Sequence, residues 1–260
     1  MFDLTALEVA LAGTIFAGKL HFSPVTGSTN TDALKAAREG APHGSVFFAD
    51  EQRSGRGRGD HAWQSAAGEG LYASILLRLS VQASTLPLVP FAAGLAAAEA
   101  IRAASGLTVD LRWPNDLLIG DRKAGGILVE SKTGAESASV VVGIGINVHQ
   151  RAFDPGLATL ATSLDLEAGD RVSRQQLLLS LLKSLERETL GLHDLAAITA
   201  IPERVAQASS WIKGRRVEVH GPQACVGVTA GLDAHGFLLV RTHEGVITVQ
   251  TGGIRAAEMS

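Results

Sequence analysis

Two adjacent apolar runs in the middle of the chain constrain its fold most strongly. They are AGGILVESK, residues 124–132, and ASVVVGIGINV, residues 138–148, and the polar letters TGAE separate them. Both runs have the composition of buried strands, and the connection between them is short. The pattern therefore predicts an antiparallel hairpin in the middle of a sheet.

Further strands and helices flank this hairpin. The other β-rich runs in this part of the chain are KLHFSPV, SVFFAD, LYASILLRL and TVDLRW. Helices are expected from Gly27 to Gly40, from Pro90 to Ser105, after the capping-box pair Ser173 and Gln176, and up to about Gln207. This order predicts an α+β fold with a mixed, mainly antiparallel sheet and flanking helices.

The character of the sequence changes beyond Trp211. The short β-rich runs RRVEVHG, ACVGVTAGLD, GFLLVRTH and GVITVQTGGI alternate with turns of Gly, Asp and His. This spacing is typical of a small β-barrel. We therefore expect two domains, residues 1–211 and residues 212–260.

Composition excludes several classes of protein. A net charge of -3 and a pI near 6.2 argue against a protein that mainly binds nucleic acid. The single cysteine, Cys225, fits a reducing compartment. Asp3 and Glu8 stand where an export signal would carry basic residues, and the apolar run from Leu86 to Ala104 is interrupted and alanine-rich, as in a core helix. A cytoplasmic protein without membrane contact is expected.

The stretch EQRSGRGRGDHAWQS places Arg56 and Arg58 between three glycines, Gly55, Gly57 and Gly59. It matches neither the dinucleotide-binding G-x-G-x-x-G pattern nor a Walker loop. Two interpretations remain. Taken alone, a solvated surface loop is the commoner one; the other is a mobile segment whose guanidinium groups fork onto a carboxylate or phosphate.

Three other stretches carry candidate ligand groups. In RWPNDLLIGDRKAGGILVE, Asn115 and Asp116 lie at a turn, and Lys123 precedes glycines that let a ligand approach the backbone. The alternative interpretation is that Asn115 and Asp116 only form an Asx turn and that Lys123 is a solvated loop lysine. In GSTN, small polar groups open a helix, where they either bind a polar head group or cap the helix. In GIGINV, Asn147 is an amide in an apolar strand and needs a hydrogen-bond partner.

Other site chemistry is absent from the sequence. The eight histidines lie singly, without an H-x-x-x-H pattern or cysteine partners, so no metal site made of protein side chains is predicted. The G-x-S-x-G elbow of serine hydrolases is also missing.

Taken together and in this order, GSTN, EQRSGRGRGDHAWQS, RWPNDLLIGDRKAGGILVE and GIGIN resemble the biotin protein ligase family, densely over residues 20–150. The resemblance implies a class II synthetase-like catalytic domain and an SH3-like C-terminal barrel. It also implies a two-step reaction. Biotin and ATP, with Mg²⁺, give biotinyl-5′-AMP and pyrophosphate, and the biotinyl group then passes to a lysine of a biotin carboxyl carrier protein domain.

The resemblance also assigns roles to individual residues. Ser28, Thr29, Asn30 and Gln52 match positions that bind the ureido ring of biotin, and Trp63 matches a tryptophan near adenine. The implied ligand-binding residues are Ser28, Thr29, Asn30, Gln52, Gly55, Arg56, Gly57, Arg58, Trp63, Asn115, Lys123, Gly126 and Asn147. The implied catalytic residues are Lys123, Arg56, Arg58 and Asp116.

The residue types fit this chemistry. Attack of a carboxylate on a phosphate brings two anions together, and Arg56, Arg58 and Lys123 can neutralise the charge in a dry site. A glycine-hinged loop can shield the adenylate from water. We hypothesise that Asp116 orients the target lysine or accepts its proton.

The sequence departs from the family pattern in two places. Asp60 stands where the family usually has glycine and His61 where it has a second basic residue, which lowers the positive charge of the loop. About twenty residues precede the matched region, too few for a helix-turn-helix domain, so a ligase without DNA binding or repressor activity is expected. The sequence leaves open whether the protein is a homodimer.

Two alternatives remain at the level of sequence. A lipoate-type protein ligase shares the general chemistry, but its arginine-rich and triple-glycine signatures are missing. A non-enzymatic module could instead bind nucleic acid or a carrier protein through Arg56, Arg58 and the C-terminal barrel, and its binding would weaken with salt without depending on nucleotide.

Overall fold

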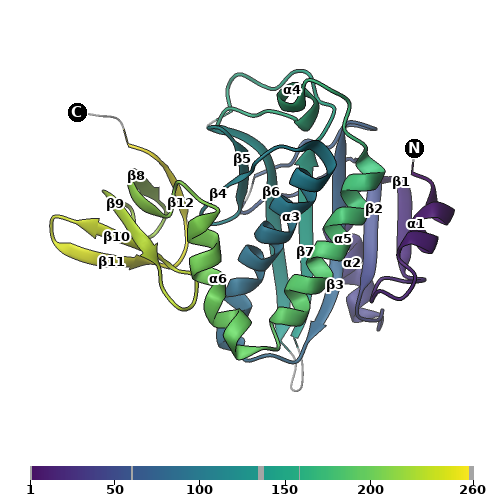
Figure 1. Cartoon of the computed structure of the whole chain (residues 1–260), viewed down its shortest axis with the longest axis horizontal. Helices are drawn as coiled ribbons and strands as arrows, with labels where there is room; N and C mark the ends of the chain where they lie inside the picture. The colour runs from purple at the N-terminus through teal and green to yellow at the C-terminus, as the bar shows by residue number, and fades with distance from the viewer. Residues whose placement is uncertain (1, 60, 134–137, 158, 258–260) are drawn as a thin grey trace.

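A seven-stranded mixed sheet forms the larger part of the molecule in the computed structural model, which describes residues 2–59, 61–133, 138–157 and 159–257 (Figure 1). The strand order is β1-β2-β3-β7-β6-β5-β4. β1 and β2 pair in parallel, and the other neighbours pair antiparallel. The strands are β1 (Leu20–Thr26), β2 (Ser45–Gln52), β3 (Gly70–Leu79), β4 (Asp110–Arg112), β5 (Asp116–Ile119), β6 (Arg122–Thr133) and β7 (Ala138–Asn147).

The predicted central hairpin is confirmed. β6 and β7 pair antiparallel from Gly125 opposite Ile146 to Thr133 opposite Ala138, and β3 continues the sheet beyond β7. Of the predicted TGAE connection, residues 134–136 lie outside the described part of the chain. The sheet is covered on both faces, which explains why these strands are nearly continuous apolar runs rather than alternating ones.

Helices form one layer on each face of this sheet. The α-helices are α1 (Leu4–Ala10), α2 (Thr29–Arg38), α3 (Val89–Ser105), α4 (Leu164–Ala168), α5 (Arg174–Gly191) and α6 (Leu195–Gln207), and the 3-10 helix η1 (Ala83–Leu88) leads into α3. α3 and α5 lie side by side over one face (Figure 1). α2 packs on the opposite face, where Ala33 meets Leu76 and Val141.

α3 is a core helix. With the preceding η1 it is long and apolar enough to cross a membrane by length and composition, but most of its residues are buried between the sheet and α5. Gly106 ends the helix at a φ of 74°, in the left-handed region that favours glycine. The interpretation of the alanine-rich run as a core helix is therefore confirmed.

A second, five-stranded antiparallel sheet follows Ile212. Its order is β11-β10-β9-β8-β12, with β8 (Lys213–His220), β9 (Cys225–Leu232), β10 (Leu238–Thr242), β11 (Gly245–Val249) and β12 (Gly253–Ala256). The fold class predicted from the sequence is confirmed; β8 begins at Lys213, and the division into two domains at residue 212 stays a prediction. Both sheets contribute to one continuous hydrophobic core.

Several elements differ from the sequence prediction. The run GVITVQTGGI was read as one strand but forms two, because the chain turns at Gly252, whose φ is 127°, and β12 returns to pair with β8. The short elements α1, α4 and β5 were not predicted. The helix over residues 174–191 was predicted, and the Ser173 side chain accepts a hydrogen bond from the Gln176 amide, as a helix N-cap should.

This N-cap yields a stability prediction. Ser173→Ala removes the acceptor for one of the free amides at the start of α5, so the free energy of unfolding should fall by about 1 kcal/mol. Urea denaturation followed by circular dichroism measures the change. Ser131→Ala, at an exposed strand position, serves as the control and should leave the midpoint unchanged.

Candidate active site

A single broad cleft, with a volume of about 1420 Å³, brings the predicted site residues together. Its walls come from the start of α2, from β6 and β7, and from the β12 edge of the second sheet. A further wall is formed by residues 56–59 and 61–64 of the segment 53–64, which we call the arginine-glycine loop. Apart from Gly55, every predicted ligand-binding or catalytic residue lines the cleft. Gly55 belongs to this loop but is buried, and a Cβ there would lie 2.4 Å from the Trp63 carbonyl oxygen.

The floor of the cleft carries a buried polar cluster at the start of α2. Thr29 donates from its backbone amide to the Gln52 side-chain oxygen at 2.9 Å, and its hydroxyl lies 2.8 Å from that of Ser74. Asn30 accepts from the Ser74 hydroxyl at 2.5 Å. Ser28 occupies the N-cap position, but its side chain makes no capping hydrogen bond. The helix-cap interpretation therefore does not account for the Ser28 hydroxyl.

Two glycines of β7 make room for side chains on this floor. A Cβ at Gly143 would lie 2.0 Å from the Asn30 side-chain oxygen, and a Cβ at Gly145 would lie 2.7 Å from the Trp63 indole nitrogen. Both contacts are closer than any real Cβ atom tolerates. The glycines of GIGIN are therefore required by the packing of Asn30 and Trp63 against the strand.

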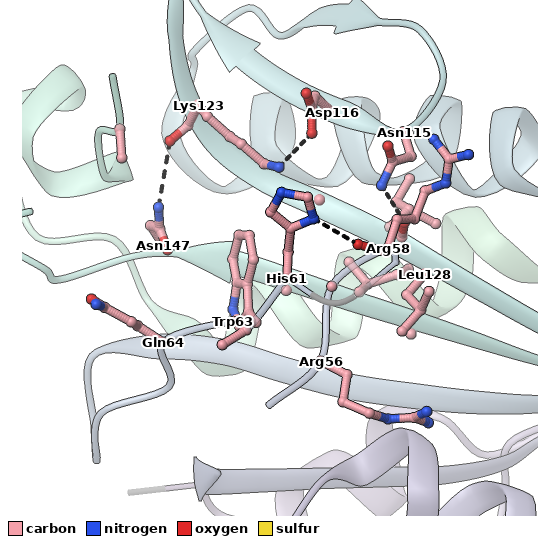
Figure 2. Close-up of a pocket in the computed structure, with 18 of the residues that line it drawn as sticks. Arg56, Arg58, His61, Trp63, Gln64, Asn115, Asp116, Lys123, Leu128 and Asn147 are labelled. Carbon is pink, nitrogen blue, oxygen red and sulfur yellow. Dashed lines mark hydrogen bonds and ion pairs between the residues drawn. The ribbon is translucent and has the colours of Figure 1, made fainter. Parts of the chain in front are cut away.

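A buried ion-pair cluster lies beside Trp63. The Asp116 carboxylate is 2.5 Å from the Lys123 ammonium and 2.6 Å from the Arg112 guanidinium, and the Asp116 side chain is only 12% exposed. Burial raises the pKa of Asp116, but attraction to Lys123 and Arg112 and their hydrogen bonds outweigh burial and hold this pKa below its usual value. Asp116, which contacts Lys123 in Figure 2, is thus a stable carboxylate and a weak base.

The two arginines of the arginine-glycine loop point in different directions. Arg58 donates to the Gly252 carbonyl oxygen at 2.9 Å and so connects the loop to the second sheet. Burial lowers the pKa of the Arg58 guanidinium, and the nearby Asp116 carboxylate opposes this shift. Arg56 turns away from Lys123 (Figure 2) and pairs with Glu130. Arg58 is therefore the inner arginine and Arg56 the outer one.

The two predicted asparagines both bind backbone groups. Asn115 donates to the Ile127 carbonyl oxygen at 2.7 Å. Asn147 is buried and donates to the Thr162 carbonyl oxygen at 3.0 Å, which confirms that an amide in this apolar strand requires a partner. These contacts fix the turn before β5 and the chain that follows β7.

Comparisons with known proteins agree with this geometry. Residues 22–147 match the model of the biotin/lipoate A/B protein ligase family. The bifunctional ligase/repressor BirA of Bacillus subtilis is 31% identical over 253 residues, which cover 95% of this chain and 77% of that protein. The biotin–acetyl-CoA-carboxylase ligase of Mycobacterium tuberculosis is 32% identical, over 88% of this chain and 85% of that protein. The chain belongs to the biotin protein ligase family.

A solved biotin protein ligase has the same fold. The enzyme from Aquifex aeolicus, in complex with biotin and ATP, superimposes with a TM-score of 0.78 at 27% identity, over 92% of this chain and 98% of that one. The family and the enzyme class predicted from the sequence are therefore confirmed. The roles of individual residues stay predictions.

Asp60 and His61 are the two residues that depart from the family pattern, and the structure describes one of them. Asp60 lies outside the described residues. His61 is exposed, and its ring nitrogen lies 3.0 Å from the Arg58 carbonyl oxygen, so it contacts the loop backbone. Site residues that the sequence did not reveal include Ser74, Arg112, Glu130 and Thr159. Among these, Glu130 offered a signal, because it is a charged residue that ends an apolar strand run.

The packing of Gly145 against Trp63 can be tested by comparing its substitution with that of a glycine that has open space around it. In Gly145→Ala, the new methyl group would displace the Trp63 ring, so the tryptophan emission should change and stability should fall by about 1–3 kcal/mol. In Gly27→Ala, the new methyl group would have no neighbouring atom within 4 Å, so the emission should stay as in wild type. Fluorescence spectra, with Trp63→Phe identifying the Trp63 contribution, measure this. Equal spectra for Gly145→Ala and wild type would contradict the packing argument.

Proposed function

We propose that the protein activates biotin with ATP to biotinyl-5′-AMP and transfers the biotinyl group to a lysine of a biotin carboxyl carrier protein domain. The observation that carries the proposal is one cleft with two different halves. One half holds the buried polar cluster of Ser28, Thr29 and Asn30, and the other holds the cations Lys123 and Arg58. The ligases from Mycobacterium and Aquifex support this assignment through their names and bound ligands.

The polar half suits the uncharged head group of biotin. Its hydroxyls and amides provide both donors and acceptors, and they are held by one another rather than by solvent. The cationic half suits the carboxylate of biotin and the α-phosphate of ATP, which must approach each other in the first step. The substrate would thus lie along the cleft with its reacting end beside Lys123.

Lys123 and Arg58 are the groups proposed to act on the first step. Lys123 pairs with the Asp116 carboxylate, and its side chain is 29% exposed in the cleft. It can therefore turn toward an incoming anion without being pulled out of the hydrophobic core. Its positive charge would stabilise the charge that develops during attack on phosphorus. Arg58 approaches from the opposite wall and keeps its contact with the second sheet.

Mg²⁺ would be carried by the nucleotide. Within the described residues there is no group of three His, Cys, Asp or Glu side chains that could hold a metal ion. Mg²⁺ usually keeps most of its waters and binds through substrate phosphates, which fits a site without a protein cage. Bound in this way, it would neutralise phosphate charge.

Asp116 is proposed to orient ammonium groups rather than to accept a proton. Its low pKa makes it a weak base, whereas its negative charge attracts Lys123 and could attract the target lysine. The loop over the cleft would protect the adenylate from water until the carrier arrives. We also propose that the reaction takes place in the cytoplasm, because the lone Cys225 suits a reducing compartment.

Exchange of labelled pyrophosphate into ATP tests the function. The wild-type protein should catalyse exchange that depends on biotin, and Lys123→Met should slow it about 100-fold or more, because one charge-stabilising group is lost. Lys132→Met changes an exposed lysine on the same strand and should exchange normally. Exchange that requires lipoate, or no exchange with biotin, would reject the proposed function.

A second variant separates the two half-reactions. Asp116→Asn removes the carboxylate that holds Lys123, so formation of the adenylate should slow. Because Asp116 is proposed to orient the target lysine, transfer from supplied biotinyl-5′-AMP should slow as well. We expect about a tenfold loss or more in each step. Single-turnover assays of each step provide the measurement, with Asp121→Asn as an exposed control. Transfer at the wild-type rate would mean that Asp116 acts only through Lys123.

A further inference from the structure

Glu130 has no role in the chemistry described so far. It lies on β6, is 27% exposed and is absent from the residues that line the cleft. Its carboxylate nevertheless accepts hydrogen bonds from two different parts of the site. Arg56 donates from both terminal nitrogens, at 3.2 and 2.6 Å, and Asn30 donates from its amide nitrogen at 2.9 Å.

The contact with Asn30 determines which way this amide faces. A carboxylate only accepts hydrogen bonds, so the Asn30 nitrogen must point to Glu130 and its oxygen must point to Ser74. Ser74 donates to that oxygen and, in turn, lies within hydrogen-bond distance of Thr29. The Asn30 side chain also packs directly against the backbone at Gly143, where a Cβ would lie 2.0 Å from its oxygen. The Leu128 carbonyl oxygen is a second acceptor for the Asn30 nitrogen, at 3.4 Å, so Glu130, at 2.9 Å, is the closer of the two partners that set the polarity of the floor cluster, and it does not line the cleft.

The contact with Arg56 fixes the outer side of the arginine-glycine loop. A forked guanidinium pair restricts the loop more than a single contact does. The other end of the loop is held through Gln52, which donates to the Ser65 hydroxyl at 2.8 Å and accepts from Thr29. The same hydrogen-bond network thus reaches the loop at both ends and passes through Asn30 and Thr29 in between.

We propose that Glu130 is a positioning residue that couples closure of the arginine-glycine loop to the orientation of the Asn30 amide. The inference rests on the proposed function, in which Asn30 contacts the head group of biotin. When the loop is closed, Arg56 neutralises Glu130 and keeps its carboxylate on Asn30. When the loop opens, Glu130 loses this partner, and the floor cluster loses its fixed polarity.

Biotin affinity measured by calorimetry without ATP tests the Asn30 half of the proposal. Glu130→Gln keeps the shape of the side chain but adds a donor, so it should weaken biotin binding about tenfold or more, as one misdirected buried hydrogen bond does. In an Asn30→Ala background, the same change should weaken binding less than about twofold, because the group it orients is gone. If the two effects multiply instead, Glu130 does not act through Asn30.

Retention of the adenylate tests the loop half. Glu130→Gln and Arg56→Gln should each release bound biotinyl-5′-AMP about tenfold faster, and the double variant should release it no faster than the faster single variant, because one shared contact is lost in all three. Arg56 is 41% exposed, so Arg56→Gln keeps the test valid if Glu130→Gln folds poorly. Adenylate release from Glu130→Gln at the wild-type rate would overturn the coupling.

A matched ion pair elsewhere provides the control. Glu99 and Arg187 form a partly exposed pair between α3 and α5, away from the cleft. Glu99→Gln should leave biotin affinity and adenylate release unchanged. If wild-type protein does not bind biotin, the proposed function fails and this inference fails with it; if wild type binds and Glu130→Gln binds equally well, the inference alone is wrong.

Discussion

The carboxylate of Asp116, buried between two cations, is the interaction on which the rest of the site depends. An unpaired charge at this depth would be very costly, so Asp116 requires a positive partner whatever else happens in the cleft. Arg112 is the partner that stays, because it is 7% exposed and also bonded to Thr159. Lys123 is therefore free to turn toward an anionic substrate without leaving Asp116 unpaired.

The central hairpin serves the fold and the site through the same residues. Its apolar side chains fill the core under α3, while Gly143 and Gly145 leave the opposite face of β7 bare at the cleft. Asn30 and Trp63 occupy the space that side chains would have taken. Because strand pairing fixes the register of β6 and β7, the floor, Gly126 and Lys123 keep fixed positions relative to one another.

The sequence predicted what local patterns encode and missed what only tertiary packing creates. Strand runs, the Ser173 cap and the four ordered motifs are local signals, and they predicted both sheets and part of the residues that line the cleft. The partners of those residues are distant: Glu130 meets Arg56 across 74 positions and Asn30 across 100. The periodicity of apolar residues in the sequence cannot predict contacts between residues so far apart. β12 was missed because a turn that depends on the contact of Gly252 with His220 interrupts an otherwise uniform β-rich run.

The second sheet is part of the site because its backbone at Gly252 is held in place where Arg58 of the arginine-glycine loop binds. Trp113, next to the Asn-Asp turn, donates to the Gly236 carbonyl oxygen. The Trp211 ring lies 5.2 Å from the Arg112 guanidinium of β4 and 3.6 Å from that of Arg215 in β8, so the two sheets are held together close to Asp116. A side chain at Gly252 would lie 2.1 Å from the His220 carbonyl oxygen, which makes glycine necessary where Arg58 binds. Arg58 therefore donates to a backbone carbonyl whose position is set by tight packing, and this contact places the arginine-glycine loop against the second sheet.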